Sequence, residues 1–362
     1  MKEDFFSYKK HFISFILIIS YVFIHFKLTG QYSEATFDKA VDLSVRLPYG
    51  QRFLIPLLAH YLHKIIPLQL HELFFLIEYL FVSLFYFSLV HLLLCEFSKK
   101  QAQALAWLFL LLLPTVMVIN YRFTIDGIAA FYFPYDTPTL FFMTLGFLFC
   151  LRAQWWSFLL LVFFATLNRE SSFLLILMIP ALHWQKLQSV YKQIIGTVLV
   201  YLLVRIFIVF LMNGMPGSWV EWYFSISNYT HFEANLLWLF QENNLLLFIF
   251  CFAGLPLFWF GFYDYIPQVY RPLRYVALLY FLLLLLVGNF FEARIFSEIL
   301  ILMYLPVCVG IYRWLSDLSL IIPENHKGIV YYINRYAVLA VLIVTLVFRM
   351  VLKTTLEYFI TK

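Results

Sequence analysis

The chain has 362 residues, of which 64% are hydrophobic and only 12% are charged, and its formal net charge is +5. An ordinary soluble domain carries about 25% charged residues, so these charges are too few to cover a soluble globule of this size. The mean hydropathy of +0.86 also excludes an intrinsically disordered chain. The composition predicts an all-α integral membrane protein that crosses the bilayer many times.

Apolar stretches of about 20 residues are long enough to cross a bilayer as a helix. About 11 stretches reach or approach this length, and they predict a single polytopic membrane domain over residues 1–362 with no soluble carboxyl-terminal domain. Two longer connections are predicted, a first outer loop at 29–71 and a second at 213–243. The predicted spans lie near residues 12–28, 72–95, 102–119, 137–152, 155–167, 171–184, 194–212, 244–263, 275–291, 295–313 and 336–355.

Positive charges near the spans indicate how the chain is oriented, because Lys and Arg favour the cytoplasmic side. Lys2, Lys9 and Lys10 precede the first apolar stretch, and Lys99 with Lys100 fall on the same side by parity. No small-residue cleavage site follows that first stretch, so it is expected to remain as a span. The amino terminus is therefore predicted to be cytoplasmic and the carboxyl terminus outside, in a bacterial cytoplasmic membrane.

The first outer loop begins with an acidic segment at residues 33–46 that is expected to form a short amphipathic helix. Glu34, Asp38 and Asp42 recur every four residues, which would stack them on one helix face. Like charges at this spacing destabilise a helix by a few tenths of a kcal/mol. The stack therefore suggests a partner, either a cation or the hydroxyl of an acceptor whose proton a carboxylate removes. The alternative is that Asp42 pairs with Arg46 on a solvated face.

Two further candidates follow along the chain. Arg52 begins an apolar stretch at 48–67 that is too short to cross and suits a helix at the outer interface, where the arginine binds a ligand or simply reaches lipid headgroups. Asp136 opens the fourth predicted span, where it is expected to cap the helix or, among aromatic residues, to bind a sugar or metal. Arg122 and Asp126 occupy the remaining outer hinge.

The triplet Asn168-Arg169-Glu170 separates two apolar runs that are each barely long enough to cross. A lone charge near lipid is costly, so Arg169 and Glu170 either pair with each other or one of them faces a ligand. An arginine beside the amides of a helix start suits phosphate.

A last cluster, Glu292, Arg294 and Glu298, lies at a later membrane boundary and has more ionisable groups than a turn needs, which favours a functional role over a structural ion pair. No basic patch typical of nucleic-acid binding is present.

Together these segments resemble the GT-C superfamily of polytopic membrane glycosyltransferases, which includes aminoarabinose transferases and protein O-mannosyltransferase relatives. The resemblance rests on the acidic first outer loop and on three sequences, YDTPTLFFMTLGF, NRESSFLLILMIPAL and EARIFSEILILMYLP. It departs from the family at the hinge, which reads Asn-Arg-Glu where better-known relatives have Lys-Gly.

The resemblance implies an inverting enzyme that moves a sugar from a lipid-linked polyprenyl-phosphate donor to an acceptor on the outer face of the membrane. It implies Asp38 as the catalytic base, with Glu34 and Asp42 as rivals, and Arg169 and Arg294 as holders of the donor phosphate. The acceptor is not identified and could be a glycan, a lipid or a protein. A divalent metal is the one cofactor that the acids would suit. The predicted substrate-binding residues are Arg52, Arg122, Asp136, Arg169, Glu170, Glu292 and Arg294.

Two other functions stay open at this point. A transporter or lipid flippase predicts ionisable groups along a path near mid-bilayer, but only Glu78 and Arg205 lie clearly within predicted spans. A polysaccharide polymerase or ligase also handles polyprenyl carriers, but usually relies on arginine-rich loops. The loop at 213–243 contains no arginine or lysine, which disfavours that alternative.

Overall fold

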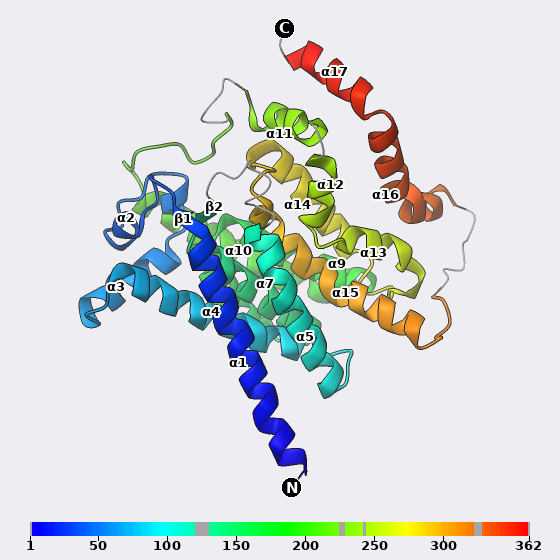
Figure 1. Ribbon diagram of the computed structural model, residues 1–362, viewed down its shortest axis with the longest axis horizontal. Coiled ribbons are helices and arrows are strands. Elements are labelled where there is room, and N and C mark those ends of the chain that lie inside the picture. Colours follow the sequence, from blue (N-terminus) through cyan, green and yellow to red (C-terminus); the bar gives the residue numbers. More distant parts are fainter. Residues whose placement is uncertain (1, 120–129, 224–228, 242–243, 322–327, 361–362) are drawn as a thin grey trace. The chain divides into compact units, whose positions relative to one another are not determined.

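A computed structural model describes residues 2–119, 130–223, 229–241, 244–321 and 328–360. Helices make up most of this part of the chain (Figure 1). Strands β1 (Thr29–Gln31) and β2 (Ala130–Tyr132) form a short parallel pair. The contacts divide the chain into unit 1, residues 1–180 and 186–220, and unit 2, residues 181–185 and 221–362.

Helix length and composition confirm the helical membrane class. Five helical segments in the described residues are long and apolar enough to cross a membrane, and two bent helix pairs could raise the number to seven. Four further apolar helices have only 10–17 residues. Each predicted stretch overlaps one of these segments, but the expected 11 crossings are not confirmed. The five long segments are Tyr8–Leu28, Leu70–Leu93, Lys99–Val118, Trp184–Leu211 and Ala293–Leu315.

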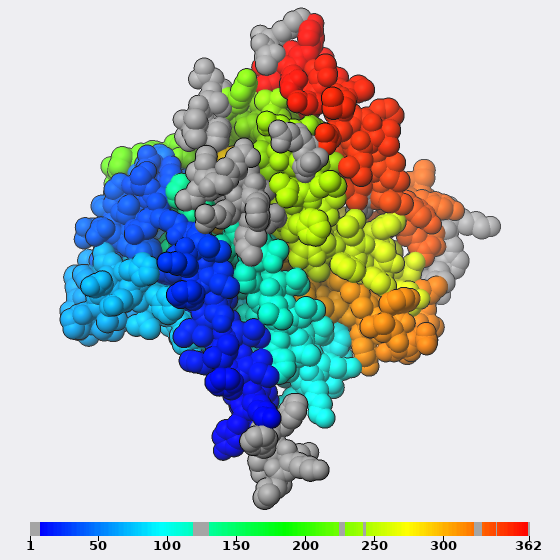
Figure 2. Space-filling model, viewed as in Figure 1, coloured from blue at the N-terminus to red at the C-terminus, as the bar shows by residue number. Residues whose placement is uncertain are grey.

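Unit 1 is built around helices α4 and α7, which pack closely along their lengths. Helices α1 and α5 pack against α4, and α8 lies between α7 and α10. The face in Figure 2 shows α1 on the outside of this unit, which agrees with the exposure of its Phe12, Phe15 and Phe23. The helices are α1 (Lys2–Leu28), α2 (Phe37–Val41), α3 (Leu54–Ile65), α4 (Leu70–Leu93), α5 (Lys99–Pro114), α7 (Asp136–Leu151), α8 (Trp155–Asn168), α9 (Phe173–Leu182) and α10 (Leu187–Leu211).

Two parts of unit 1 that are distant in sequence meet at Gly217. Leu47 donates its backbone N–H to the carbonyl of Pro216 at 2.9 Å. Gly217 has a φ of +103°, and a Cβ added there would lie 2.3 Å from the Leu47 carbonyl oxygen. Only glycine fits this close approach without strain. The segment after α10 is thereby fastened to the loop that leads into α3.

Unit 2 is organised around α15, whose residues 297–310 are all buried. Helices α13 and α14 pack against α15, and α11 packs against α14 and α17. Burial on all sides explains why this helix is apolar around its whole circumference. The helices are α11 (His231–Phe240), α12 (Asn244–Phe250), α13 (Leu255–Gly261), α14 (Leu273–Val287), α15 (Ser297–Leu315), α16 (Ile329–Val347) and α17 (Arg349–Ile360).

Candidate functional site

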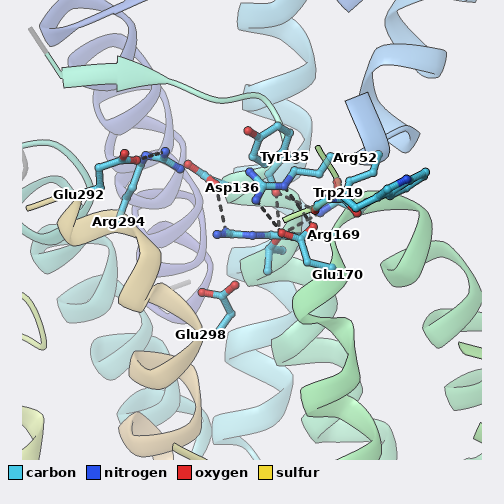
Figure 3. A network of polar contacts seen from close by, with 12 residues as sticks. Arg52, Tyr135, Asp136, Arg169, Glu170, Trp219, Glu292, Arg294 and Glu298 are labelled. Carbon is cyan, nitrogen blue, oxygen red and sulfur yellow. Dashed lines mark hydrogen bonds and ion pairs between the residues drawn. The ribbon is translucent and has the colours of Figure 1, made fainter. Parts of the chain in front are cut away.

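The turn between α8 and the start of α9 holds a buried ion pair. Asn168 ends α8, and Arg169 follows with an extended backbone. The Arg169 guanidinium donates to Asp136 Oδ1 at 3.2 Å, and the two side chains are only 5% and 0% exposed (Figure 3). Asp136 is the first residue of α7, and residues 133–135 connect it to the end of β2. The pair therefore joins the start of one apolar helix to the end of another.

A second ion pair lies on the other side of the same turn. Arg52 donates two hydrogen bonds to Glu170, from Nε at 3.2 Å and from Nη2 at 2.6 Å (Figure 3). The Arg52 guanidinium also lies 4.4 Å from the centre of the Tyr135 ring. Two parallel bonds give an arginine–carboxylate pair both strength and a fixed orientation. We call Arg52, Asp136, Arg169 and Glu170 the hinge cluster.

Uncharged groups fix the geometry of the hinge cluster. The Asn168 side-chain amide donates to the Tyr135 carbonyl at 3.0 Å and to Thr139 Oγ1 at 2.9 Å. The Phe53 backbone N–H donates to the Leu167 carbonyl at 2.8 Å, next to Arg52. These bonds hold the start of α7, the end of α8 and the loop before α3 together, so the charged side chains are preorganised.

The hinge cluster bears on two sequence predictions. Of the two alternatives for Arg169 and Glu170, mutual pairing is not observed: Arg169 binds Asp136 and Glu170 binds Arg52, because their side chains leave the turn toward different segments. Asp136 does not occupy the N-cap position of α7. Tyr135 does, without a side-chain cap hydrogen bond, and the Asp136 carboxylate binds Arg169 instead. Sequence analysis selected all four residues but not their partners.

The charges of the hinge cluster stabilise one another. Burial raises the pKa of Glu170, but the attraction of Arg52 and its hydrogen bonds outweigh burial and lower this pKa to about 2. For Arg52 the signs are opposite. Burial alone would lower its pKa, but the attraction of Glu170 and its hydrogen bonds outweigh burial and raise the pKa above its ordinary value. Arg52 is 13% exposed and Glu170 is 35% exposed, so this pair, unlike Arg169 with Asp136, is open to a ligand from outside.

A third arginine of unit 1, from α10, lies close to this region. Arg205 donates to Gln51 Oε1 at 2.5 Å, and the Gln51 amide donates to the Trp219 carbonyl at 3.3 Å. Arg205 Nη1 is buried and has no hydrogen-bond partner among the described residues. Sequence analysis noted Arg205 within a predicted span but not as a site residue. Its position inside an apolar helix was the available signal, because an intramembrane arginine is costly without a role.

A buried carboxylate in α4 forms a second polar cluster of unit 1 that sequence analysis did not select. Glu78 is 1% exposed, as is His25 of α1, whose Nδ1 lies 2.9 Å from Glu78 Oε1. Thr137 and Tyr132 donate to Glu78 at 2.5 and 3.2 Å. Thr137 follows Asp136 directly, so Glu78 holds the first turn of α7 from its other side. An acid inside a predicted span was again the signal.

The acidic stack predicted for the first outer loop is wrong. Helix α2 spans only Phe37–Val41, with Thr36 rather than Ser33 as its N-cap. Glu34 precedes the helix and pairs with Arg46, while Asp42 is the C-cap. The expected pairing of Asp42 with Arg46 is therefore replaced. Asp38 and Asp42 are exposed. The buried apolar side of α2 is confirmed and consists of Phe37, Ala40 and Val41.

The late cluster of the sequence lies in unit 2. Glu292 accepts a hydrogen bond from Arg294, which is 4% exposed. Glu298 is fully buried in the first turn of α15 and accepts hydrogen bonds from Tyr280 at 3.0 Å and from Ser297 at 3.1 Å. The predicted ion pair is thus present, and Glu298 has its own partners. Figure 3 shows these side chains at the start of α15.

Asn235 of α11 fixes the loop that carries this late cluster. Its side-chain amide donates to the Gly288 carbonyl at 2.7 Å and to the Leu285 carbonyl at 3.1 Å. The Phe290 backbone N–H donates to Asn235 Oδ1 at 2.9 Å. Three hydrogen bonds to one buried amide fix the chain between α14 and Glu292.

The predicted residues Arg122 and Asp126 lie outside the described residues. Within the described residues, no group of three or more His, Cys, Asp or Glu side chains could hold a metal ion. A cavity bordered by Asn168 and Arg169 has a volume of about 10 Å³, which is room for one water molecule and not for a sugar. A larger ligand would meet the hinge cluster at Arg52 and Glu170.

Comparison of the chain with protein-family models, with curated proteins and with solved structures finds no match in any of the three. The resemblance to the GT-C superfamily therefore stays a prediction from the sequence. The function is argued below from the residues themselves.

Proposed function

We propose that this protein is a membrane glycosyltransferase of the GT-C type, which moves a sugar from a polyprenyl-phosphate donor to an acceptor on the outer face of the membrane. The observation that carries the proposal is the hinge cluster, in which Arg52 and Arg169 are preorganised at one end of α8. Preorganised guanidinium groups are suited to bind a phosphate that gains negative charge as a bond breaks.

Each arginine has a distinct task in this proposal. Arg52 is 13% exposed and provides the first contact of the donor phosphate, while Arg169, 5% exposed, supplies positive charge behind it. Glu170 and Asp136 orient the two guanidinium groups before the donor arrives. Arg294, which belongs to unit 2 and is held by Glu292, is a further phosphate holder that the family resemblance alone implies.

The acceptor side of the reaction needs a base that can be reached. Asp38 remains the proposed base, because its exposed carboxylate lies on the short helix α2 and is accessible to an acceptor hydroxyl. The base takes the hydroxyl proton as the acceptor oxygen attacks the anomeric carbon, and the bond to the donor phosphate breaks. Direct attack inverts the anomeric centre. Glu34 is a weaker candidate because Arg46 already holds it, and Asp42 caps a helix end.

The test is sugar transfer by the purified chain in liposomes that contain polyprenyl-phosphate sugars. We expect transfer by the wild type, a loss of at least about 100-fold in Asp38→Asn, since a general base contributes about 10²–10⁴-fold, and a clear loss in Arg294→Ala. Asp42→Asn is the matched control and should retain its rate. Full activity in both Asp38→Asn and Arg294→Ala would contradict the proposal.

One observation favours a second candidate, a transporter or lipid flippase. His25 and Glu78 form a buried ionisable pair within apolar helices, as residues along proton pathways do. This alternative predicts lipid or solute movement across proteoliposomes that Glu78→Gln abolishes. The glycosyltransferase proposal predicts that no such movement depends on Glu78.

A further inference from the structure

The amino-terminal end of α8 carries an open hollow that the proposed glycosyl transfer does not use. The hollow has a volume of about 620 Å³ and lies between the turn before α8 and the first turns of α10. This volume is within the range of about 300–1,000 Å³ that is usual for small-molecule sites. Its lining consists of Ala153, Gln154, Trp155, Trp156, Ser157, Leu159, Lys192 and Gln193.

The charges around this hollow have one sign. Lys192 lines it, Arg152 directly precedes it in the chain, and Lys186 precedes α10. Residues 151–167 and 171–204 contain no Asp or Glu. These cations therefore have no acidic partner in either of the two segments that form the hollow, in contrast to those of the hinge cluster. An anion that enters the hollow would meet Lys192, the one charged residue among the described residues that line it.

The lining also has the character of a membrane boundary. Trp156 is 88% exposed, and Trp155 lies beside it. Tryptophan is enriched at the level of lipid headgroups, where its ring contacts acyl chains and its N–H contacts polar groups. Gln154 is the N-cap of α8 and makes no side-chain cap hydrogen bond. The amino-terminal end of α8, where the helix dipole is positive, lies at the same place.

We propose that this hollow binds the head group of an anionic phospholipid of the phosphatidylglycerol type. The phosphate pairs with Lys192 and lies near the positive amino-terminal end of α8. The Ser157 hydroxyl and the Gln154 amide are available to the glycerol hydroxyls, and the Trp156 ring lies along the upper acyl chain. A zwitterionic lipid should bind more weakly, because Lys192 repels the positive charge of its head group. This site does not depend on sugar transfer, and its test can succeed or fail separately.

The experiment measures lipid binding by the full chain in detergent, by titration with dioleoyl phosphatidylglycerol or dioleoyl phosphatidylcholine and detection of the complexes by native mass spectrometry. We expect phosphatidylglycerol to bind more tightly than phosphatidylcholine. Lys192→Gln should weaken phosphatidylglycerol binding about 5-fold, the usual effect of one basic residue near an anionic lipid surface. Lys100→Gln, which removes an exposed lysine from the first turn of α5, is the matched control and should bind as the wild type does.

A second readout uses the native tryptophan. Phosphatidylglycerol with brominated acyl chains should quench part of the protein fluorescence, and Trp156→Phe should reduce that part. Equal affinity for the two lipids would overturn the proposal. So would the same loss in Lys100→Gln as in Lys192→Gln, or quenching in Trp156→Phe that matches the wild type. An unchanged thermal unfolding midpoint of Lys192→Gln excludes misfolding as the cause of its weaker binding.

Discussion

At the Asn168 end of α8, each hinge-cluster arginine binds a carboxylate, and Arg169 and Asp136 are almost completely removed from solvent. At the Trp155 end of the same helix, Lys192 lines an open hollow, the exposed Arg152 directly precedes its lining in the chain, and neither adjoining segment contains an acid. The two ends share one apolar helix, so lipid contact alone does not explain the difference.

The contrast separates two uses of positive charge at a membrane boundary. A buried cation must be paired, because an isolated charge in a medium of low dielectric constant is very costly. A cation at the rim keeps contact with water and can remain available to an external anion. Paired arginines at one end therefore serve geometry and the proposed donor phosphate, whereas the cations at the other end serve recognition of lipid.

The largest effect is expected at the Asn168 end of α8, where the ion pair is buried. Arg169→Ala leaves the fully buried Asp136 without this cation, and breaking a buried ion pair on one side costs about 3–5 kcal/mol. We expect a large drop in the unfolding midpoint in detergent. Arg152→Ala, at the exposed end, is the control and should leave the midpoint nearly unchanged. Equal effects of the two substitutions would remove the distinction between the ends.

A second destabilising effect is expected at Glu78, the carboxylate that holds Thr137 in the first turn of α7. Glu78→Leu removes the acceptor of the Thr137 and Tyr132 hydroxyls. Leaving buried donors unsatisfied costs about 1–3 kcal/mol each. Unfolding by denaturant should reveal this loss, and Glu78→Gln should recover part of it because the amide oxygen still accepts. A Leu variant as stable as the wild type would show that these hydrogen bonds contribute little.

Low pH should weaken the Arg52–Glu170 ion pair, which is the more exposed pair of the hinge cluster. The pKa of Glu170 is about 2 in the folded chain against an ordinary 4.5. Its ionised form therefore contributes stability above pH 4.5, and the contribution is lost as the pH falls toward 2. At 35% exposure, water screens the pair, so we expect an effect below about 1 kcal/mol. Unfolding midpoints between pH 6 and pH 3 should fall more in the wild type than in Glu170→Gln, and parallel curves would contradict the assigned pairing.

The smallest effect is expected at the solvent-exposed pair of the first loop. Glu34 and Arg46 are 40% and 29% exposed, and such pairs typically contribute about 0.2–1 kcal/mol. Glu34→Ala should shift the unfolding midpoint only slightly, and added salt should erase the difference. A loss as large as that of Arg169→Ala would mean that the first loop is as tightly bound to the fold as the hinge cluster.

The apolar segments were predictable because each carries its signal locally, in a run of hydrophobic residues. The partners of the charged residues were not, since Arg52 and Glu170 are 118 residues apart and nothing near either one indicates the other. The prediction of a stacked acidic face in the first loop was wrong for a different reason. Its spacing suits a helix over 33–46, but Thr36 starts α2 late and Leu43, with a φ of 54°, follows the end of α2. Local capping therefore overrode the periodicity that would have aligned Glu34 and Asp42.

The central claim is that the hinge cluster binds the phosphate of a polyprenyl carrier, and the most direct measurement is the Kd of polyprenyl monophosphate for three forms of the chain. We predict that Arg52→Gln binds at least about 10-fold more weakly than the wild type, since a charge-assisted hydrogen bond contributes about 1.5–3 kcal/mol. Glu170→Gln, which leaves Arg52 charged, should bind at least as tightly as the wild type. The same Kd for all three forms would contradict the claim.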